Sequence, residues 1–377
     1  MKYPFLDLAK VNEPYYDELV RAAERVIRSG RYIGGEEVEA FETELSQMLK
    51  APYIIGVSNG LDALRLILRA YIQLGVFKEG DEVIYPANTF IASVLAISDA
   101  GLVPVPVDID ERTLNIDTSL IEAAVTERTK AIMPVHLYGN IVWDDTLVAV
   151  ARRYSLKIIE DSAQALGAYG SLCGLHESSF AGALGDAGAI SFYPTKNVGA
   201  LGDAGAVVTF DGELARVVRT LANYGSDRQY HNIYRGFNCR IDPIQAAMLR
   251  VKLPYLAKEN SDRTERALAY QNTIDRQGIY LPYITHEKHD QVWHQYVIRV
   301  DNHKRDRFRE MLEREGVGTA IHYAVPPHKQ PCYSGMAHGD LPVTERIADE
   351  LVSLPIATGT SVADTMEIGR IINRLDF

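Results

Sequence analysis

The chain has 377 residues, of which 47% are hydrophobic and 24% charged, a composition typical of a folded globular protein. This length favours two lobes, because single hydrophobic cores stop growing at about 250–300 residues. The net charge of −11 argues against nucleic acid as the main partner, since phosphate backbones are bound by clustered lysine and arginine, but it leaves room for a small anion held by a few cations.

The start of the chain predicts a cytoplasmic protein. Residues 1–20 read MKYPFLDLAKVNEPYYDELV, which lacks the basic and then apolar pattern of a secretion signal. No long uncharged apolar run could cross a bilayer, so no membrane partner is expected. Cys173, Cys239 and Cys332 form no disulfide framework, as expected in a reducing compartment. Cys173 and His176 have ligand-like spacing, but no second pair follows, and we predict no metal site.

Short apolar runs rich in β-branched residues alternate with helical patterns through the first two-thirds of the chain. YIIGV precedes LDALRLILRAYIQL, and EVIYP precedes TFIASVLAISDAG. Further runs that look like buried strands lie at Val103–Asp110, Lys130–Gly139 and Leu156–Gln164. This alternation predicts an α/β fold with a mostly parallel sheet covered by helices. Ligands of such sheets lie beyond the carboxyl ends of the strands. That edge carries Asn59, Asn88, His136 and Asp161.

An internal repeat flanks one lysine. GALGDAGA occurs at Gly182–Ala189 and again at Gly199–Ala206, and each copy leads into an apolar strand. Two strands with turn-rich leads and a short connection predict a hairpin or a neighbouring pair. Turn chemistry alone explains the glycines, since they allow positive φ and close backbone approach. Lys196, the cation in the connection, is what suggests a further role for it.

The pattern changes after about residue 240. The stretch IDPIQAAMLRVKLPYLAKENSDRTERALAYQNTI reads as long, charged helix that is disturbed locally at Pro254. The remainder, including the apolar run Trp293–Val300, predicts a smaller α+β lobe. We therefore expect a large α/β domain over residues 1–250 and a smaller C-terminal α+β domain over residues 251–377.

Several sequence features together favour a cofactor site. The strand-to-helix junction Ser58–Leu64 carries a glycine, so free N–H groups at the helix start can hold a phosphate. Asp161 ends a buried strand, where a carboxylate needs a charged or hydrogen-bonded partner. Phe90 follows another strand and could stack on a planar ligand. Ser191 lies five positions before Lys196, on the strand that presents it.

Pyridoxal 5′-phosphate (PLP) requires this set of groups. An enclosed lysine amine bonds to the aldehyde, and a carboxylate keeps the ring nitrogen protonated. Each feature alone has a plainer explanation: a solvated lysine, a surface or capping acid, an ordinary helix cap and a core phenylalanine. Their joint occurrence, in this order and each at a strand end, favours PLP.

The chain resembles the DegT/StrS-type aminotransferases, PLP enzymes of the aspartate-aminotransferase fold (fold type I) that act on nucleotide-linked keto-sugars. The similarity covers nearly the whole chain, from PFLDL and SGRYIGG to HYAVPPH. The motifs between these ends are GVSNGLDAL, PANTFIAS, PVHLYG, IIEDSAQALGA, GDAGAISFYPTKN, GDAGAVVT and RGFNCRIDPIQAA. So many motifs in one order make chance similarity a poor explanation.

The resemblance implies which residues hold the ring of PLP. Lys196 would bind the cofactor covalently and act in catalysis. Asp161 would be the partner of the pyridine nitrogen, and Phe90 would stack on the ring. Gln164 would contact the ring hydroxyl region, where many relatives have histidine.

The resemblance also implies contacts to the phosphate and to the sugar. The phosphate contacts would come from Gly60, Leu61 (threonine in many relatives) and Ser191, and across a dimer interface from Asn238 or Arg240. The sugar would contact Tyr32, His322 and Tyr323, with Tyr224 and Arg228 as weaker candidates. The expected assembly is a homodimer with shared active sites.

A lysine at position 196, where some members of the family carry histidine and dehydrate their substrate, implies amino transfer. The donor would be an amino acid, expected to be L-glutamate, and the acceptor C3 of a dTDP-3-keto-6-deoxyhexose. Such amino sugars would enter lipopolysaccharide or S-layer glycan. The alternatives are amination at C4 of a related nucleotide sugar and a regulatory protein without turnover. A nicotinamide-linked oxidoreductase ranks last, because no GxGxxG motif opens a helix after the first strand.

Overall fold

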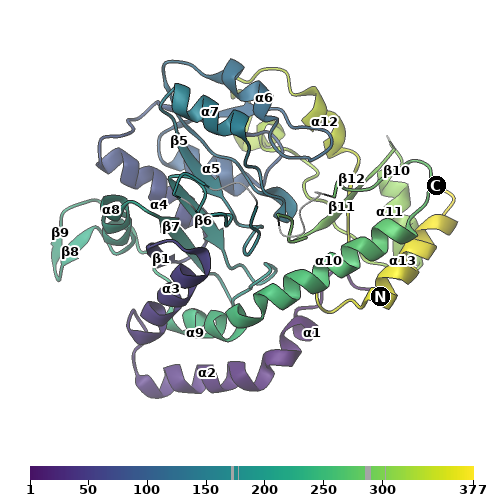
Figure 1. The fold of residues 1–377 in the computed structure, drawn as a ribbon, viewed down its shortest axis with the longest axis horizontal. Helices are drawn as coiled ribbons and strands as arrows, with labels where there is room; N and C mark the ends of the chain where they lie inside the picture. The colour runs from purple at the N-terminus through teal and green to yellow at the C-terminus, as the bar shows by residue number, and fades with distance from the viewer. Residues whose placement is uncertain (171–173, 177, 285–289, 302) are drawn as a thin grey trace.

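A seven-stranded sheet forms the centre of the larger lobe (Figure 1). The computed structural model describes residues 1–170, 174–176, 178–284, 290–301 and 303–377. The strands are β1 (Tyr53–Val57), β2 (Glu82–Pro86), β3 (Val103–Val107), β4 (Thr129–Ile132), β5 (Lys157–Asp161), β6 (Ala187–Ser191) and β7 (Gly205–Thr209), in the spatial order β1-β7-β6-β5-β4-β2-β3. Pairs among β2, β3, β4, β5 and β6 are parallel, whereas β7 pairs antiparallel with β1 and β6. The predicted mostly parallel sheet is confirmed, and the two repeats lead into antiparallel neighbours.

Helices cover both faces of this sheet, which is why its strands are apolar on both sides. On β1, Ile55 and Val57 pack in one cluster with α4 (Gly60–Gln73), α5 (Ile91–Asp99) and α8 (Gly212–Ala222), whereas Ile54 packs in another with α3 (Glu36–Leu49) and α9 (Pro243–Lys252). Alternate residues of a strand point to opposite faces, so a single run feeds two cores. The helices of this lobe are α1 (Leu8–Asn12), α2 (Tyr16–Ser29), α3 (Glu36–Leu49), α4 (Gly60–Gln73), α5 (Ile91–Asp99), α6 (Thr118–Ile121), α7 (Asp145–Arg153), α8 (Gly212–Ala222) and α9 (Pro243–Lys252).

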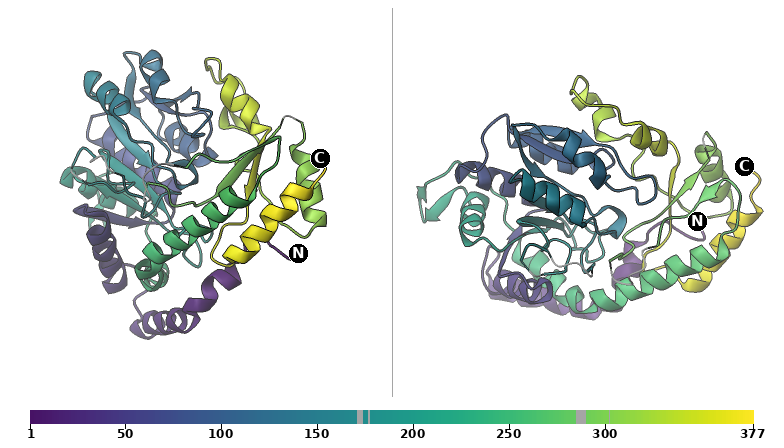
Figure 2. Two further views of the ribbon diagram at one scale, coloured as in Figure 1. Left: turned by 45° about the vertical axis from the view of Figure 1, so that its right-hand side comes forward. Right: turned by 45° about the horizontal axis from the view of Figure 1, so that its top comes forward.

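The long charged stretch after residue 240 is helical, with the expected disturbance at its proline. Helix α9 ends at Lys252, a 3-10 turn follows at Leu253–Tyr255, and α10 (Leu256–Thr273) continues to the smaller lobe. Proline lacks the N–H that an inner helical turn needs, so Pro254 stands at the start of the short turn between the two helices. In both figures α10 runs from the sheet to the far lobe, where α13 (Val362–Arg374) lies beside it (Figures 1 and 2).

The smaller lobe is built on a three-stranded antiparallel sheet. It has the order β10 (Ile279–Tyr280), β11 (Tyr296–Val300) and β12 (Leu351–Leu354). Helices α10, α11 (Arg305–Arg314) and α13 share a core with this sheet, whereas α12 (Pro342–Ala348) packs through Ile347 against Val135 and Leu137 of the larger lobe. Its core also includes Tyr3, which bonds through its backbone to Gly316 and Gly318, so the N-terminus joins the C-terminal lobe. The division at residue 250 stays a prediction. A two-stranded ribbon, β8 (Ser226–Arg228) and β9 (His231–Asn232), projects from the larger lobe (Figure 1).

An apolar cluster between the lobes brings the end of the sheet to the late segments of the chain. Val135 and Leu137, which follow β4, pack with Val297 of β11 and Leu351 of β12. Asp108 adds a polar link, because its carboxylate accepts from the amides of residues 343 and 344 at the start of α12, at 2.9 and 2.8 Å. The carboxyl edge of the sheet therefore faces the smaller lobe.

Candidate active site

Lys196 lies in the connection between β6 and β7, and its amide donates to Tyr193 O at 2.8 Å. Burial of the amine lowers its pKa from 10.5 to about 8, and the negative charge of Asp161 works in the opposite direction. The charges of Lys196 and Asp161 are thus close enough to interact, because β5, which ends at Asp161, pairs with β6, which leads to Lys196. A lysine with this pKa has far more free amine at neutral pH than an ordinary one.

Asp161 ends β5 with its carboxylate held in one orientation. The residue is only 6% exposed, and Oδ2 accepts from Ser93 Oγ at 2.7 Å, while Oδ1 accepts from the amide of Ala163 at 3.2 Å. The Ser93 hydroxyl lies 2.9 Å from that of Thr89. These partners keep a buried carboxylate satisfied. Ser93 was missed in the sequence; its signal was a polar residue in the first turn of an otherwise apolar helix.

Gln164 and Tyr323 are joined by a hydrogen bond in the neighbourhood of Asp161. Gln164 accepts from the amide of Tyr138 at 2.6 Å and donates to the Tyr323 hydroxyl at 3.1 Å. The Tyr138 hydroxyl donates to the backbone oxygen of His322 and accepts from Asn88 at 3.3 Å. Tyr138, absent from the candidate set, therefore links the sheet edge to the His-Tyr pair of the smaller lobe.

Phe90 is not a core residue. Its side chain is 53% exposed at the start of α5, and its ring centroid lies 5.4 Å from that of Tyr323 at an angle of 38°. This exposure leaves a ring available for stacking. His322 bonds through Nδ1 to Ser353 Oγ at 2.8 Å, and burial together with the charge of Lys196 lowers its pKa to about 4. His322 is thus neutral at physiological pH.

The start of α4 meets the end of β6 at very close range. Asn59 caps the helix by accepting from the amide of Asp62 at 2.8 Å, which leaves the amides of Gly60 and Leu61 at the helix start for a ligand. A Cβ atom at Gly60 would lie 2.8 Å from the Ser191 Cβ, and one at Gly205 would lie 2.4 Å from the backbone of Asn59. Backbone donors and a serine hydroxyl therefore line a cradle that side chains would fill.

The remaining candidates make their contacts elsewhere in the described chain. Arg240 donates to Asn223 Oδ1 at 2.9 Å and lies over the ring of Tyr224, 5.3 Å from its centroid, and Asn238 pairs through its backbone with Asn223. Tyr32 is 58% exposed after α2 and donates to Ile27 O at 3.2 Å. Arg228 lies on exposed β8. None of these contacts involves Lys196.

Glu160 and His136, near the carboxyl edge of the sheet, have structural partners. Glu160 is fully buried and accepts from the amides of Gly182, Leu184 and Gly185 at 2.7–2.8 Å, so it holds the first glycine-rich repeat. Its other neighbour is His136 Nε2 at 2.8 Å.

Cys173, considered above for its spacing to His176, lies outside the described residues. Within the described ranges no three His, Cys, Asp or Glu side chains gather as metal ligands, and no helix is long and apolar enough to span a bilayer.

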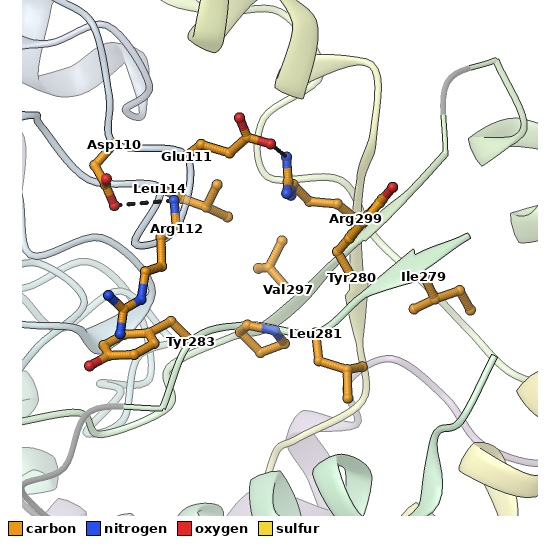
Figure 3. Close-up of a pocket in the computed structure, with 11 residues that line it drawn as sticks. Asp110, Glu111, Arg112, Leu114, Ile279, Tyr280, Leu281, Tyr283, Val297 and Arg299 are labelled. Carbon is orange, nitrogen blue, oxygen red and sulfur yellow. Dashed lines mark hydrogen bonds and ion pairs between the residues drawn. The ribbon is translucent and has the colours of Figure 1, made fainter. Parts of the chain in front are cut away.

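A separate cavity of about 580 Å³ lies between the lobes (Figure 3). Glu111 and Arg299, which both line the cavity, form an ion pair of 2.7 Å. Two other lining residues are also in contact, because the guanidinium of Arg112 lies 3.8 Å from the ring centroid of Tyr283. None of the candidate site residues lines this cavity. We therefore place the candidate site at Lys196 and not in this cavity.

The residues around Lys196 fit PLP. The cofactor needs a lysine that can be deprotonated, a carboxylate for its ring nitrogen, an aromatic plate and a phosphate cradle. Lys196, Asp161 and Phe90 supply the first three, and the Gly60–Ser191 cradle supplies the fourth. The role of each residue toward the cofactor stays a prediction, although the structure brings these groups to one edge of the sheet.

Comparisons with known proteins agree with this chemistry. Residues 15–373 match the DegT/DnrJ/EryC1/StrS aminotransferase family. The chain is 46% identical over 374 residues to the dTDP-3-amino-3,6-dideoxy-alpha-D-galactopyranose transaminase of Aneurinibacillus thermoaerophilus, covering 99% of both. It is 43% identical over 358 residues to the dTDP-3-amino-3,4,6-trideoxy-alpha-D-glucose transaminase of Streptomyces venezuelae, covering 94% of this chain and 91% of that one. The crystal structure of S. venezuelae DesV with a ketimine intermediate is similar at a TM-score of 0.91 and 41% identity, over 100% of both chains.

Proposed function

Because the chain belongs to the DegT/DnrJ/EryC1/StrS aminotransferase family, we propose that it aminates C3 of a dTDP-3-keto-6-deoxyhexose. It is a PLP-dependent aminotransferase, as the resemblance implied. The amino group comes from an amino acid, for which L-glutamate is the proposed donor. The preference for C3 is supported by the two relatives whose names place the amino group on that carbon of a dTDP-sugar.

The observation that supports amino transfer best is that Lys196 follows β6, the direct neighbour of the strand that ends at Asp161, and that burial lowers the pKa of its amine while the charge of Asp161 raises it. PLP, when bound, withdraws electrons from the substrate carbon so that its proton can leave. Lys196 then takes up and returns that proton, because an amine with a pKa of about 8 can do both near neutral pH. Asp161 keeps the ring nitrogen protonated, and Ser93 holds the carboxylate in place at 2.7 Å.

The proposed phosphate contacts are the amides of Gly60 and Leu61 and the hydroxyl of Ser191, all at the cradle. His322 and Tyr323 are proposed to contact the sugar, and the ring of Tyr323 lies 5.4 Å from the exposed ring of Phe90. His322 is neutral, so it offers a hydrogen bond and no charge. Gln164 and Tyr323 share a hydrogen bond of 3.1 Å, so the position of the sugar-binding tyrosine depends on a residue proposed to contact the cofactor.

An assay with C3-keto and C4-keto nucleotide sugars side by side tests this function. Purified protein, PLP and L-glutamate should convert the C3-keto dTDP-sugar, and NMR of the product should show nitrogen on C3. Nitrogen on C4 would favour the alternative. Absence of amino transfer across the panel would support a regulatory protein without turnover. Lys196→Ala should abolish transfer while leaving the far-ultraviolet circular dichroism unchanged.

A homodimer with shared sites is part of the proposal. Asn238 or Arg240 is proposed to reach the phosphate of the partner subunit; within one chain these residues contact Asn223 and Tyr224. Exposed apolar side chains on α2 and after it support such an interface: Tyr16 (67%), Ile27 (63%), Tyr32 (58%) and Ile33 (55%).

Mixing two inactive variants tests the shared site. Lys196→Ala and the double variant Asn238→Ala/Arg240→Ala, refolded together, should regain about a quarter of wild-type activity, because half of a random dimer mixture is hybrid and each hybrid has one intact site. No recovery, or a monomeric mass by light scattering, would contradict the dimer. Cytoplasmic location, use of the amino sugar in lipopolysaccharide or S-layer glycan, and the division into domains 1–250 and 251–377 complete the proposal.

A further inference from the structure

A network of three buried side chains begins at the residue that follows Lys196. Asn197 donates from Nδ2 to Asn260 Oδ1 at 2.8 Å and to Val292 O at 3.2 Å, and its Oδ1 lies 3.0 Å from His294 Nδ1. The exposed fractions of Asn197, Asn260 and His294 are 7%, 8% and 7%. The lysine's neighbour is thus tied both to α10 and to the segment that enters β11.

Backbone oxygens determine where the protons of this network lie. The carbonyls of Leu166 and Val292 can only accept, so the amide nitrogens of Asn260 and Asn197 must face them, at 3.1 and 3.2 Å. Asn260 Oδ1 then accepts from Asn197, and Asn197 Oδ1 must accept from His294. His294 therefore carries its proton on Nδ1, which leaves the Nε2 lone pair free of that bond.

The segment that carries His294 is itself held in place. Arg263 of α10 donates to Trp293 O at 3.3 Å, and the amide of Val292 donates to Gly139 O at 2.8 Å. A Cβ atom at Gly139 would lie 3.0 Å from the amide nitrogen of His294 and 3.1 Å from Gln164 O. Gly139, at φ +91°, therefore lets the segment that carries His294 pack close to the backbone of Gln164.

Charged groups from three elements meet at this place. Burial lowers the pKa of Lys196, whereas the negative charge of Asp161 on β5 raises it. The positive charge of Lys196 in turn lowers the pKa of His294 and of His322 in the smaller lobe. Burial, then Lys196, then Arg263 of α10 and His322 lower the pKa of His294 well below its usual value. Both histidines are therefore neutral, and the charged side chains that act on this place are Lys196, Arg263 and Asp161.

We propose that Asn197 and His294 are positioning residues that hold the Lys196 amine in its buried place beside Asp161. The proposal rests on the proposed role of Lys196 in binding PLP. A lysine side chain is flexible, and its ammonium gains hydration whenever it turns toward solvent. Lys196 is only partly buried as a whole residue, so such a turn is open to it. Anchoring the backbone and the next side chain on two elements opposes that turn.

The test follows the amine directly, in full-length protein freed of cofactor. PLP is added over a range of pH, borohydride fixes the bond, and peptide mass spectrometry gives the rate at which Lys196 is labelled. In the wild type this rate should rise around pH 8, where the amine loses its proton. Asn197→Ala and His294→Gln should shift the midpoint of labelling rate against pH upward by about one to two pH units. At neutral pH this shift makes labelling of Lys196 about 10- to 100-fold slower, because less of the amine is deprotonated.

Two further variants separate positioning from general stability. His294→Asn should restore much of what His294→Gln loses, because an asparagine amide nitrogen lies near the Nδ1 position and still donates to Asn197, whereas a glutamine amide reaches the Nε2 position. Tyr270→Phe removes a buried hydrogen bond of 2.9 Å to Pro355 O from the same helix α10. It should lower the melting temperature and leave the labelling midpoint where it is.

The outcomes distinguish the two proposals. Labelling at Lys196 with unmoved midpoints in Asn197→Ala and His294→Gln would overturn the positioning role alone. Equal midpoints for His294→Asn and His294→Gln would overturn the assigned hydrogen bond from Nδ1. Wild-type labelling at another lysine would overturn the proposed role of Lys196, and the positioning role with it.

Discussion

Replacing Lys196 by methionine should make the cofactor-free protein more stable at neutral pH, although it removes the proposed reactive group. The pKa of this amine falls from 10.5 to about 8 because burial penalises the charged form. At about 1.4 kcal/mol for each pKa unit, the charged lysine costs the native state about 3 kcal/mol. Methionine is unbranched, of similar length and uncharged, so it avoids this cost.

The difference between the two proteins should depend on pH in a defined direction. Below pH 8 the lysine is protonated in both the folded and the unfolded chain, and the whole cost is present. Between pH 8 and 10.5 the folded chain releases its proton first, so the wild type gains stability relative to Lys196→Met. Above 10.5 the lysine is neutral in both states and the cost disappears.

Urea unfolding of both cofactor-free proteins at about pH 7, 9 and 10.5 checks this expectation. The advantage of Lys196→Met should shrink steadily across the series. Lys78→Met, at an exposed lysine, is the matched control and should change the free energy of unfolding by less than about 0.5 kcal/mol at each pH. Equal or lower stability of Lys196→Met at pH 7 would refute the claim that the amine is buried at a cost.

Three further predictions concern the groups around the lysine. Ser93→Ala removes the 2.7 Å bond to Asp161, worth about 1.5–3 kcal/mol to a charged acceptor, so kcat should fall at least tenfold; an unchanged kcat would contradict this role. Gly60→Ala places a Cβ 2.8 Å from that of Ser191 and should weaken PLP binding about tenfold in a fluorescence titration, whereas Gly339→Ala, with open space around it, should not. Glu160→Gln turns an amide donor toward buried N–H groups and should lower the free energy of unfolding by about 2–4 kcal/mol; a loss under 1 kcal/mol would argue against that network.

Local patterns in the sequence were enough to predict the fold class and to single out Lys196 and Asp161. Strand and helix periods are visible over five to fifteen residues, so β1 to β5 and the helices α4 and α5 could be predicted directly, whereas α6 and α7 were not predicted. The repeat at Gly182 and Gly199 predicted the pair β6 and β7, because glycine-rich turns mark strand starts whatever the tertiary context. Pro254 marked the break between α9 and α10 for an equally local reason, its missing N–H.

Only the tertiary structure decided which side chains meet around the lysine. Ser93 and Asp161 are 68 residues apart, Asn197 and His294 are 97 apart, and their contacts depend on the strand order and on how the smaller lobe packs. The same holds for Phe90, a core residue by its type but exposed beside Tyr323 in the fold. A hydrogen bond is directional over about 3 Å, whereas periodicity describes one element at a time. Distant partners of this kind therefore become visible only when the elements have been placed against one another.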